Sequence, residues 1–135
     1  MKLYHYSFTE NILKEGLDAY YKHPDTVAIN DLIVNKFGDS FGRDYCVFFN
    51  LNKIDNGDII VSVDSSNLDI EQLFVADQDL ADAIYSNWYR GNDCDTLLEN
   101  YIKSIISFKS YNGEYENSEV FYTDCVPANF LKIEK

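Results

Sequence analysis

The sequence is poor in basic residues: 11 of its 135 residues are Lys or Arg, against 23 Asp or Glu, and the formal net charge is −12. Proteins hold a nucleic-acid backbone with clustered Lys and Arg, so direct binding of nucleic acid is not expected. The acidic residues are scattered and form no acidic tail. Such a charge favours solubility, and it can also steer the chain to a basic partner, including a nucleic-acid-binding protein with a positive groove.

Cysteine and histidine are also scarce. Cys46, Cys94 and Cys125 show no CxxC spacing, and no basic and apolar signal segment precedes the first predicted strand, which favours a reducing cytoplasm. His5 and His23 have no paired spacing with each other or with a cysteine, so no metal is expected. No apolar run approaches the length of a bilayer span, and no membrane partner is expected.

Hydrophobic residues are plentiful, at 46% of the chain, and aromatic residues alone make up 16%. Disordered chains are poor in both, so this chain is expected to fold. Its length fits one domain, residues 1–135, that buries roughly two-thirds of the surface exposed by the unfolded chain.

Hydrophobic periodicity predicts mixed strands and helices. The expected strands are residues 2–7, 45–49 and 59–63, a hairpin of 108–111 with 118–123, and a short strand after Pro127. Helices are expected to begin at Thr9 or Glu10, at Asp25 or Thr26, within 69–84 as one or two short helices, and at Asp95 or Thr96. Strand segments at both ends, with no GxGxxG motif or P-loop between them, favour an α+β fold over a doubly wound parallel sheet.

Glycines and polar residues mark the breaks between these elements. Gly16 and Gly38 are typical helix stops. Residues 37–44 are predicted to form a loop, and residues 55–58 a turn. The apolar runs 45–49 and 59–63 lack alternation, which is typical of central strands.

Several short segments, taken in chain order, resemble a divergent small mono-ADP-ribosyltransferase over nearly the whole chain. They are Tyr4-His5-Tyr6-Ser7, residues 12–17, residues 42–49, residues 118–122 and residues 126–131. The resemblance implies an α+β fold of two packed, mostly antiparallel sheets around an NAD cleft with flanking helices. It also implies NAD as a substrate and three motif positions that hold NAD and assist the transfer.

The first motif position is His5, which in this family hydrogen-bonds a ribose of NAD. Ser7 follows two residues later on the same side of the strand, so the pair could orient a sugar. Tyr6 is a further candidate for an aromatic ring at the cofactor, because its position borders NAD in relatives with a His-Tyr first motif, whereas many other relatives have glycine there. The alternative for His5 is a half-buried strand residue that hydrogen-bonds to the backbone.

The second position is an aromatic ring that stacks on nicotinamide. Tyr45 or Phe49 could supply it, since both are predicted on one strand face. Each ring could equally belong to the core. Arg43 is a candidate for the pyrophosphate, because a guanidinium matches phosphate geometry.

The third position is Glu119, at the start of a predicted strand. Cleavage of the nicotinamide glycosidic bond builds positive charge on the ribose, and a carboxylate beside that sugar stabilises the transition state. Glu114, Glu116 and Asp124 compete for this role, and a solvated surface glutamate is the alternative. Asn117 stands where arginine-modifying relatives have Glu or Gln two residues before the catalytic glutamate.

The leading hypothesis is therefore transfer of ADP-ribose from NAD to a macromolecular target, a protein, by a toxin, a defence component or a phage counter-defence factor. The alternative is an acidic, non-enzymatic inhibitor, a nucleic-acid mimic similar to anti-CRISPR proteins, that binds a basic nucleic-acid-binding protein. A third hypothesis is a relative of the RNA 2′-phosphotransferases, and the shortage of Arg and Lys argues against it.

Overall fold

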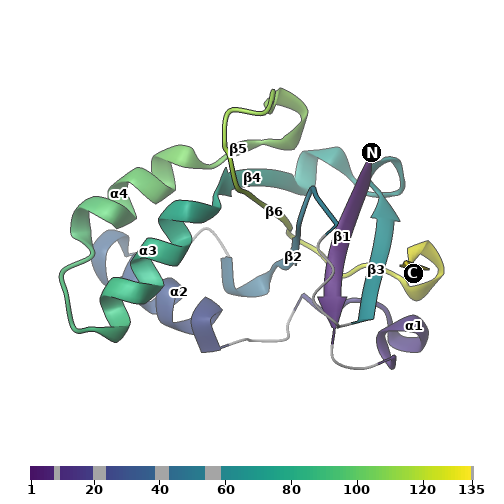
Figure 1. Ribbon diagram of the computed structural model, residues 1–135, viewed down its shortest axis with the longest axis horizontal. Coiled ribbons are helices and arrows are strands. Elements are labelled where there is room, and N and C mark those ends of the chain that lie inside the picture. The colour runs from purple at the N-terminus through teal and green to yellow at the C-terminus, as the bar shows by residue number, and fades with distance from the viewer. Residues whose placement is uncertain (8–9, 20–23, 39–42, 54–58, 135) are drawn as a thin grey trace.

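The computed structural model of the protein describes residues 1–7, 10–19, 24–38, 43–53 and 59–134, and its class is α+β (Figure 1). The strands are β1 (Lys2–Ser7), β2 (Val47–Phe49), β3 (Ile59–Asp64), β4 (Leu73–Asp77), β5 (Ile106–Ser107), β6 (Ser118–Tyr122) and β7 (Lys132–Glu134). The helices are α1 (Ile12–Glu15), α2 (Pro24–Phe37), α3 (Gln78–Tyr89) and α4 (Asp95–Ser104). The predicted α+β class is confirmed.

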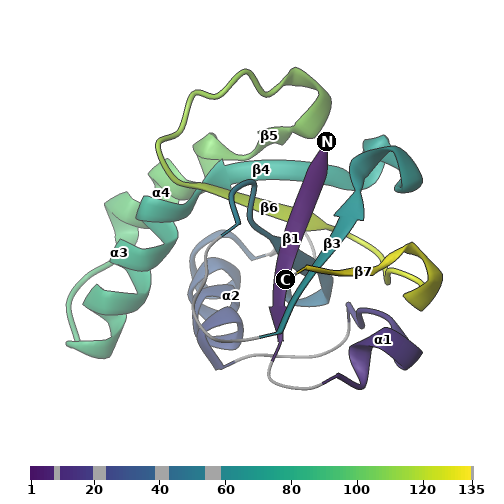
Figure 2. The same cartoon turned by 45° about the vertical axis from the view of Figure 1, so that its right-hand side comes forward.

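The strands form two antiparallel sheets, one in the order β1-β3-β7 and one in the order β2-β6-β4-β5. Figure 2 shows β1 running crosswise over β4 and β6. Leu3 of β1 and Val63 of β3 pack into one core with Val75 of β4 and Val120 of β6, and each of the four is at most 1% exposed. The two sheets therefore pack face to face, as expected.

A short backbone bridge joins the sheets at the end of β2. The amide of Tyr4 in β1 donates to the carbonyl of Asn50 at 2.9 Å, and the amide of Asn50 donates back to the carbonyl of Tyr4 at 2.8 Å. This pair holds the first strand beside the residues that follow β2.

Helices α2, α3 and α4 lie together beside the four-stranded sheet (Figures 1 and 2). They pack on the face of this sheet that points away from the three-stranded sheet. There they form a second core, which contains Ile33 of α2, Ile84 of α3, Tyr101 of α4 and Phe121 of β6. Alternate residues of a strand point to opposite faces, so Val120 and Tyr122 face the sheet-on-sheet core while Glu119 shares the helix-covered face with Phe121. This alternation brings an acidic side chain into the interior.

Gly16 ends α1, as predicted, and it is needed there for two reasons. Its φ is +80°, a conformation that L side chains rarely adopt, and a Cβ at this position would lie 2.3 Å from the carbonyl oxygen of Val126. The next residue, Leu17, forms a two-way backbone bridge with Val126. The close approach ties the N-terminal region to the segment that leads into β7.

The prediction of a central strand at residues 45–49 is wrong about where the strand begins and about its position in the sheet. Arg43–Tyr45 form a 3₁₀ turn, and the strand begins at Val47 and lies at the edge of its sheet. Its apolar run reflects burial on both faces, because Val47 and Phe49 enter the sheet-on-sheet core while Phe48 packs against the helix-side core. The run 59–63 is central as predicted, since β3 lies between β1 and β7.

One further prediction holds only in part, and another is wrong. The segment 69–84 contains the strand β4 before α3 begins, and β4 is buried on both faces, so it lacks the alternation by which a strand is recognised. The predicted hairpin does not form, because Phe108–Ser110 make a 3₁₀ turn and β6 pairs with β2 and β4 instead.

The second helix begins at Pro24, so Asp25 and Thr26 lie in its first turn and do not precede it. Proline suits the first helical position, where no intrahelical acceptor is needed for its missing N–H. The helix ends before Gly38, as predicted. The predicted helix start at Thr9, part of the loop (39–42) and the turn 55–58 lie outside the described residues.

Candidate functional site

Glu119, the second residue of β6, is the centre of a buried polar cluster. Its side chain is only 6% exposed, and its Oε2 accepts a hydrogen bond from Nη2 of Arg43 at 3.1 Å. Its Oε1 accepts from the hydroxyl of Tyr101, and that hydroxyl in turn accepts from Nε of Arg43 at 2.9 Å. The three side chains, here called the buried triad, close a ring of hydrogen bonds that links a turn, a helix and a strand.

Arg43 enters the triad from the 3₁₀ turn that precedes β2. Its guanidinium carbon lies 5.0 Å from the centroid of the Phe48 ring and 5.5 Å from that of the Tyr101 ring, distances at which a cation is attracted to an aromatic face. The residue is 3% exposed, and its Nη1 has no hydrogen-bond partner among the described residues. Ring contacts and hydrogen bonds thus hold the guanidinium in one place.

The protonation states of two triad members, Tyr101 and Arg43, follow from their burial and from the charges beside them. Burial, the largest cause, and the negative charge of Glu119 raise the pKa of Tyr101 well above its ordinary value. Burial acts to lower the pKa of Arg43, but the charge of Glu119 and the bond to Tyr101 outweigh it, and the pKa of Arg43 is raised. Tyr101 therefore keeps its proton and Arg43 its charge throughout the physiological pH range.

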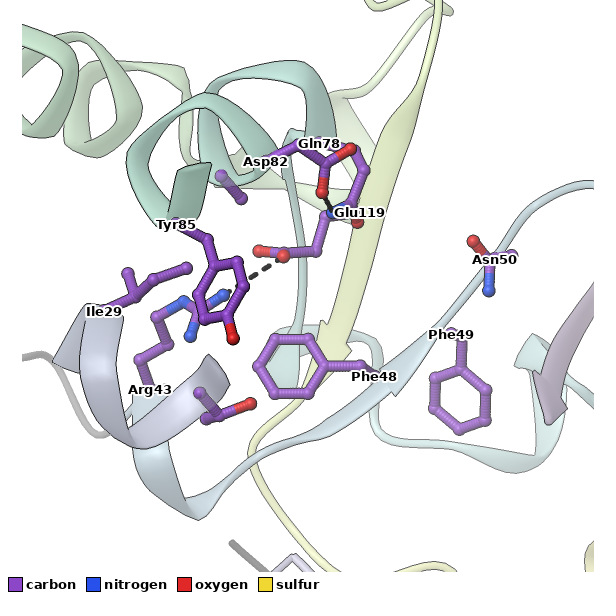
Figure 3. Close-up of a pocket in the computed structure, with 11 residues that line it drawn as sticks. Ile29, Arg43, Phe48, Phe49, Asn50, Gln78, Asp82, Tyr85 and Glu119 are labelled. Carbon is purple, nitrogen blue, oxygen red and sulfur yellow. Dashed lines mark hydrogen bonds and ion pairs between the residues drawn. The ribbon is translucent and has the colours of Figure 1, made fainter. Parts of the chain in front are cut away.

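Two members of the triad, Arg43 and Glu119, line a cavity of about 280 Å³ (Figure 3). Its polar lining includes Arg43, Asn50, Gln78, Asp82 and Glu119, and its aromatic lining consists of Phe48, Phe49 and Tyr85. A second hollow of about 270 Å³ shares Asn50, Gln78 and Asp82 with the first, so the two adjoin. Each is just below the ~300–1,000 Å³ of most small-molecule sites and suits a sugar or a single ring.

Three of the predicted site residues line this cavity: Glu119, Arg43 and Phe49. Glu119 is not the solvated surface residue that was the alternative, because it is almost wholly buried. Arg43 has Glu119 as its counter-ion inside the protein, and a contact with pyrophosphate stays a prediction. Phe49 is 2% exposed and belongs to the sheet-on-sheet core, so little of its ring is open to a ligand.

His5 lies next to β2 and is not one of the residues that line the cavity. Its Nδ1 is 2.9 Å from the carbonyl oxygen of Phe48, and its ring stands edge-on to Phe49 with 6.1 Å between centroids. Burial lowers the pKa of His5, and the bond to the Phe48 backbone offsets this only in part. A neutral His5 that donates from Nδ1 has Nε2 left as an acceptor.

Tyr6, Ser7 and Tyr45 also lie outside the cavity lining. Tyr6 donates its hydroxyl to the carbonyl of Asn52 at 3.2 Å, and Asn52 borders the second hollow. Ser7 shares a strand face with His5, as predicted, because both are odd-numbered positions of β1. Tyr45 is 46% exposed in the 3₁₀ turn and not on a strand face with Phe49, which corrects the expected geometry of the aromatic stack.

Sequence reasoning missed Tyr101, Gln78 and Asp82. Tyr101 falls within the helix that hydrophobic periodicity predicts from Asp95 or Thr96, and its neighbours Leu97, Leu98, Ile102 and Ile105 are aliphatic. A buried tyrosine must find a partner for its hydroxyl, so a tyrosine within an aliphatic stripe was a signal that a polar group lies opposite. Gln78 and Asp82 are joined by a side-chain hydrogen bond of 2.8 Å on α3, and no pattern in the chain set them apart from other surface residues.

Within the ranges that the structure describes, no three His, Cys, Asp or Glu side chains lie close enough to hold a metal ion. In the same ranges, none of the helices has both the length and the apolar character needed to cross a bilayer.

Comparison of the chain with protein-family models, curated proteins and solved structures finds no match in any of the three. The resemblance to ADP-ribosyltransferases therefore stays a prediction. The chemistry of the cavity and of the triad is the guide to function.

Proposed function

We propose that the protein is a mono-ADP-ribosyltransferase that moves ADP-ribose from NAD to a protein target. The observation that carries the proposal is a buried carboxylate, Glu119, paired with Arg43 at a cavity that has aromatic rings in its wall. In the reaction the bond between C1′ of the ribose and the nicotinamide nitrogen breaks, and its electron pair leaves with nicotinamide. The acceptor attacks C1′ and loses a proton.

Glu119 would act on the charge that develops during bond cleavage. As the nicotinamide departs, the ribose becomes cationic, and a carboxylate fixed beside it stabilises this state more than the ground state. The glycosidic chemistry resembles that of glycoside hydrolases, in which carboxylates have the same task. Asn50 and Gln78 offer amide groups to the sugar hydroxyls from the same cavity.

The other predicted positions have supporting roles in this proposal. His5, with Ser7 and Tyr6 beside it on β1, would contact a ribose of NAD through Nε2. The ring next to nicotinamide would come from Phe48 or Tyr85, whose partly exposed rings border the cavity, because Tyr45 lies outside the lining and Phe49 is 2% exposed. For Arg43 we favour orientation of Glu119 over a pyrophosphate contact, because its charge is already matched by that carboxylate.

The test is incubation of the pure protein with NAD, with release of nicotinamide and transfer of label from the adenylate half to lysate proteins as the two readouts. We expect wild type to show both, and Glu119→Gln to lose about 10²-fold or more in rate, as when one stabilising group of a transition state is removed. Glu116→Gln is the matched control, since it makes the same change on an exposed residue three positions away, and it should behave as wild type. If wild type shows neither nicotinamide release nor label transfer, the proposed ADP-ribosyltransferase activity is refuted.

The biological setting belongs to the same proposal. An enzyme of this kind would act in the cytoplasm of a bacterial or phage-infected cell, as a toxin, a defence component or a counter-defence factor. A net charge of −12 would steer it toward a basic target protein.

A second candidate function is an acidic inhibitor that occupies the basic groove of a nucleic-acid-binding protein. It is favoured by the net charge and by two exposed rings at the C-terminal end of α3, Trp88 at 43% and Tyr89 at 78% exposure, since aromatic residues are enriched at interfaces. It predicts binding to a purified basic nucleic-acid enzyme that weakens with added salt and is unchanged by NAD or by Glu119→Gln. Binding that does not respond to salt would contradict it.

A further inference from the structure

We propose that Tyr101 is a positioning residue that locks the carboxylate of Glu119 in its orientation at the cavity. The inference rests on the proposed function and deepens it, because it names the group that makes Glu119 competent. Tyr101 lies in α4 and is 0% exposed. It would affect the reaction only through its hydrogen bond to Glu119.

The direction of the hydrogen bonds in the triad is fixed by Arg43. A guanidinium can only donate, so the Tyr101 oxygen must accept from Nε of Arg43. The single hydroxyl proton of Tyr101 is then directed to Oε1 of Glu119, which as a carboxylate can only accept. There is therefore one pattern of donors and acceptors in which all three bonds form.

The two oxygens of Glu119 are held from different elements. Oε2 is bound by Nη2 of Arg43, from the 3₁₀ turn, and Oε1 by the hydroxyl of Tyr101, from α4. A carboxylate held at both oxygens cannot turn about its terminal bond, whereas one held at a single oxygen can pivot. Since Tyr101 is 0% exposed, its hydroxyl is bound within the protein and is not open to solvent.

Arg43 is not free to compensate for a lost hydroxyl. Its guanidinium is held by the faces of the Phe48 and Tyr101 rings, and Tyr101→Phe would leave both rings in place. The substitution would thus release Oε1 of Glu119 and leave Nε of Arg43 without its acceptor, while Oε2 keeps its bond to Nη2. Reacting groups must be held within about 0.5 Å, and a misplacement of about 1 Å can lower a rate by about 10²-fold.

The kinetic test compares Tyr101→Phe with Tyr115→Phe in nicotinamide release. Tyr115 is a matched control, because its hydroxyl also makes a hydrogen bond, to the carbonyl of Ser104 at 2.5 Å, and it lines neither cavity. We expect Tyr101→Phe to lower kcat by about 10²-fold with KM for NAD unchanged, and Tyr115→Phe to keep both values. An unchanged kcat in Tyr101→Phe, in an enzyme whose wild type is active, would overturn the positioning role.

A second measurement tests the lock without any turnover. A hydroxyl proton held inside a buried hydrogen bond exchanges slowly and gives a proton NMR signal downfield of the amides. We expect this signal in wild type and in Tyr115→Phe, its loss in Tyr101→Phe, and an upfield shift in Glu119→Gln, where the acceptor is no longer charged. The proposal that Tyr101 holds Glu119 would be overturned if wild type gave no such signal. It would also be overturned if Glu119→Gln left the signal unchanged.

The two measurements separate the possible failures. Wild type that releases no nicotinamide but shows the proton signal means that the proposed function is wrong and the lock is present. Active wild type with no signal, or with full activity in Tyr101→Phe, means that Glu119 is positioned in another way. If Tyr101→Phe does not fold, Glu119→Gln still gives the decisive NMR comparison.

Discussion

Replacement of Arg43 by methionine should destabilise the protein severely. The side chains of Arg43 and Glu119 are 4% and 6% exposed, and Arg43→Met removes the positive partner while the carboxylate stays enclosed. The hydrogen bond to Glu119 and the one to Tyr101 are lost together. Breaking a buried ion pair from one side costs about 3–5 kcal/mol, which is a large part of the 5–15 kcal/mol typical of a whole domain.

Urea unfolding followed by circular dichroism measures the effect, with an unchanged slope as evidence that the transition is still two-state. The control is Lys109→Met, which removes the ion pair between Lys109 and Glu71. These two side chains are 49% and 68% exposed, and the pair should contribute about 0–1 kcal/mol although its N–O distance is only 2.6 Å. Comparison of the two variants tests whether burial, and not the N–O distance, sets the contribution of an ion pair to stability. The pair with the shorter distance, Lys109–Glu71, is predicted to contribute less.

A double variant distinguishes two causes of the lost stability: the loss of the ion pair itself, and the burial of an unpaired carboxylate at Glu119. Arg43→Met combined with Glu119→Gln removes both charges, and an amide can still accept a hydrogen bond from Tyr101. Replacing a whole buried pair is often neutral, so we expect the double variant to recover most of the stability lost by Arg43→Met alone. A cost of Arg43→Met no larger than that of Lys109→Met, or no recovery in the double variant, would refute this reasoning.

Two further predictions concern the fold and its pH dependence. Gly16→Ala should lower the melting temperature well beyond the effect of Gly113→Ala. Both glycines have positive φ, which strains an alanine by about 1–3 kcal/mol, and Gly16 combines it with a ψ of −170°, a region almost confined to glycine. A Cβ at Gly16 would also lie 2.3 Å from the carbonyl oxygen of Val126, whereas a Cβ at Gly113 would meet no atom of the described residues within 4 Å. Equal shifts would count against the close approach. The pKa of His5 is lowered from 6.5, so the unfolded chain takes up its proton first and His5 contributes stability above pH 6.5 that is lost as the pH falls toward the lowered pKa. In His5→Gln, the urea midpoint should fall less steeply as the pH is lowered over this acidic interval. If the midpoint falls as steeply as in wild type, groups other than His5 cause the loss of stability.

Local patterns predicted the elements whose residue pattern is plain in the sequence. The strand β1 was predicted with its observed bounds, and α4 was predicted from hydrophobic periodicity with its start at Asp95 or Thr96. Gly16 was predicted as a helix stop, and it has the positive φ that such a stop requires. The strand β4 was missed because burial on both faces removes alternation, and burial on the second face depends on helices that follow later in the chain.

The candidate site shows the same division. In the sequence, the resemblance to ADP-ribosyltransferases pointed to His5 and Glu119, and the match of a guanidinium to phosphate geometry pointed to Arg43. Sequence reasoning did not pair Glu119 with Arg43, since 76 residues separate them, and it gave Tyr101 no polar role. His5 and Tyr45 were expected at the same cleft as Glu119, but neither lines the cavity.

By itself, the sequence determined the acidic charge, the α+β class, the helix stop at Gly16 and the presence of a carboxylate at the start of a strand. The tertiary structure alone decided that this carboxylate points inward, because the alternation of β6 and the position of the helices place Glu119 on the covered face. A buried carboxylate must have partners, and the turn before β2 and the middle of α4 supply them as Arg43 and Tyr101. These contacts join segments far apart in the chain, so no local pattern could contain them.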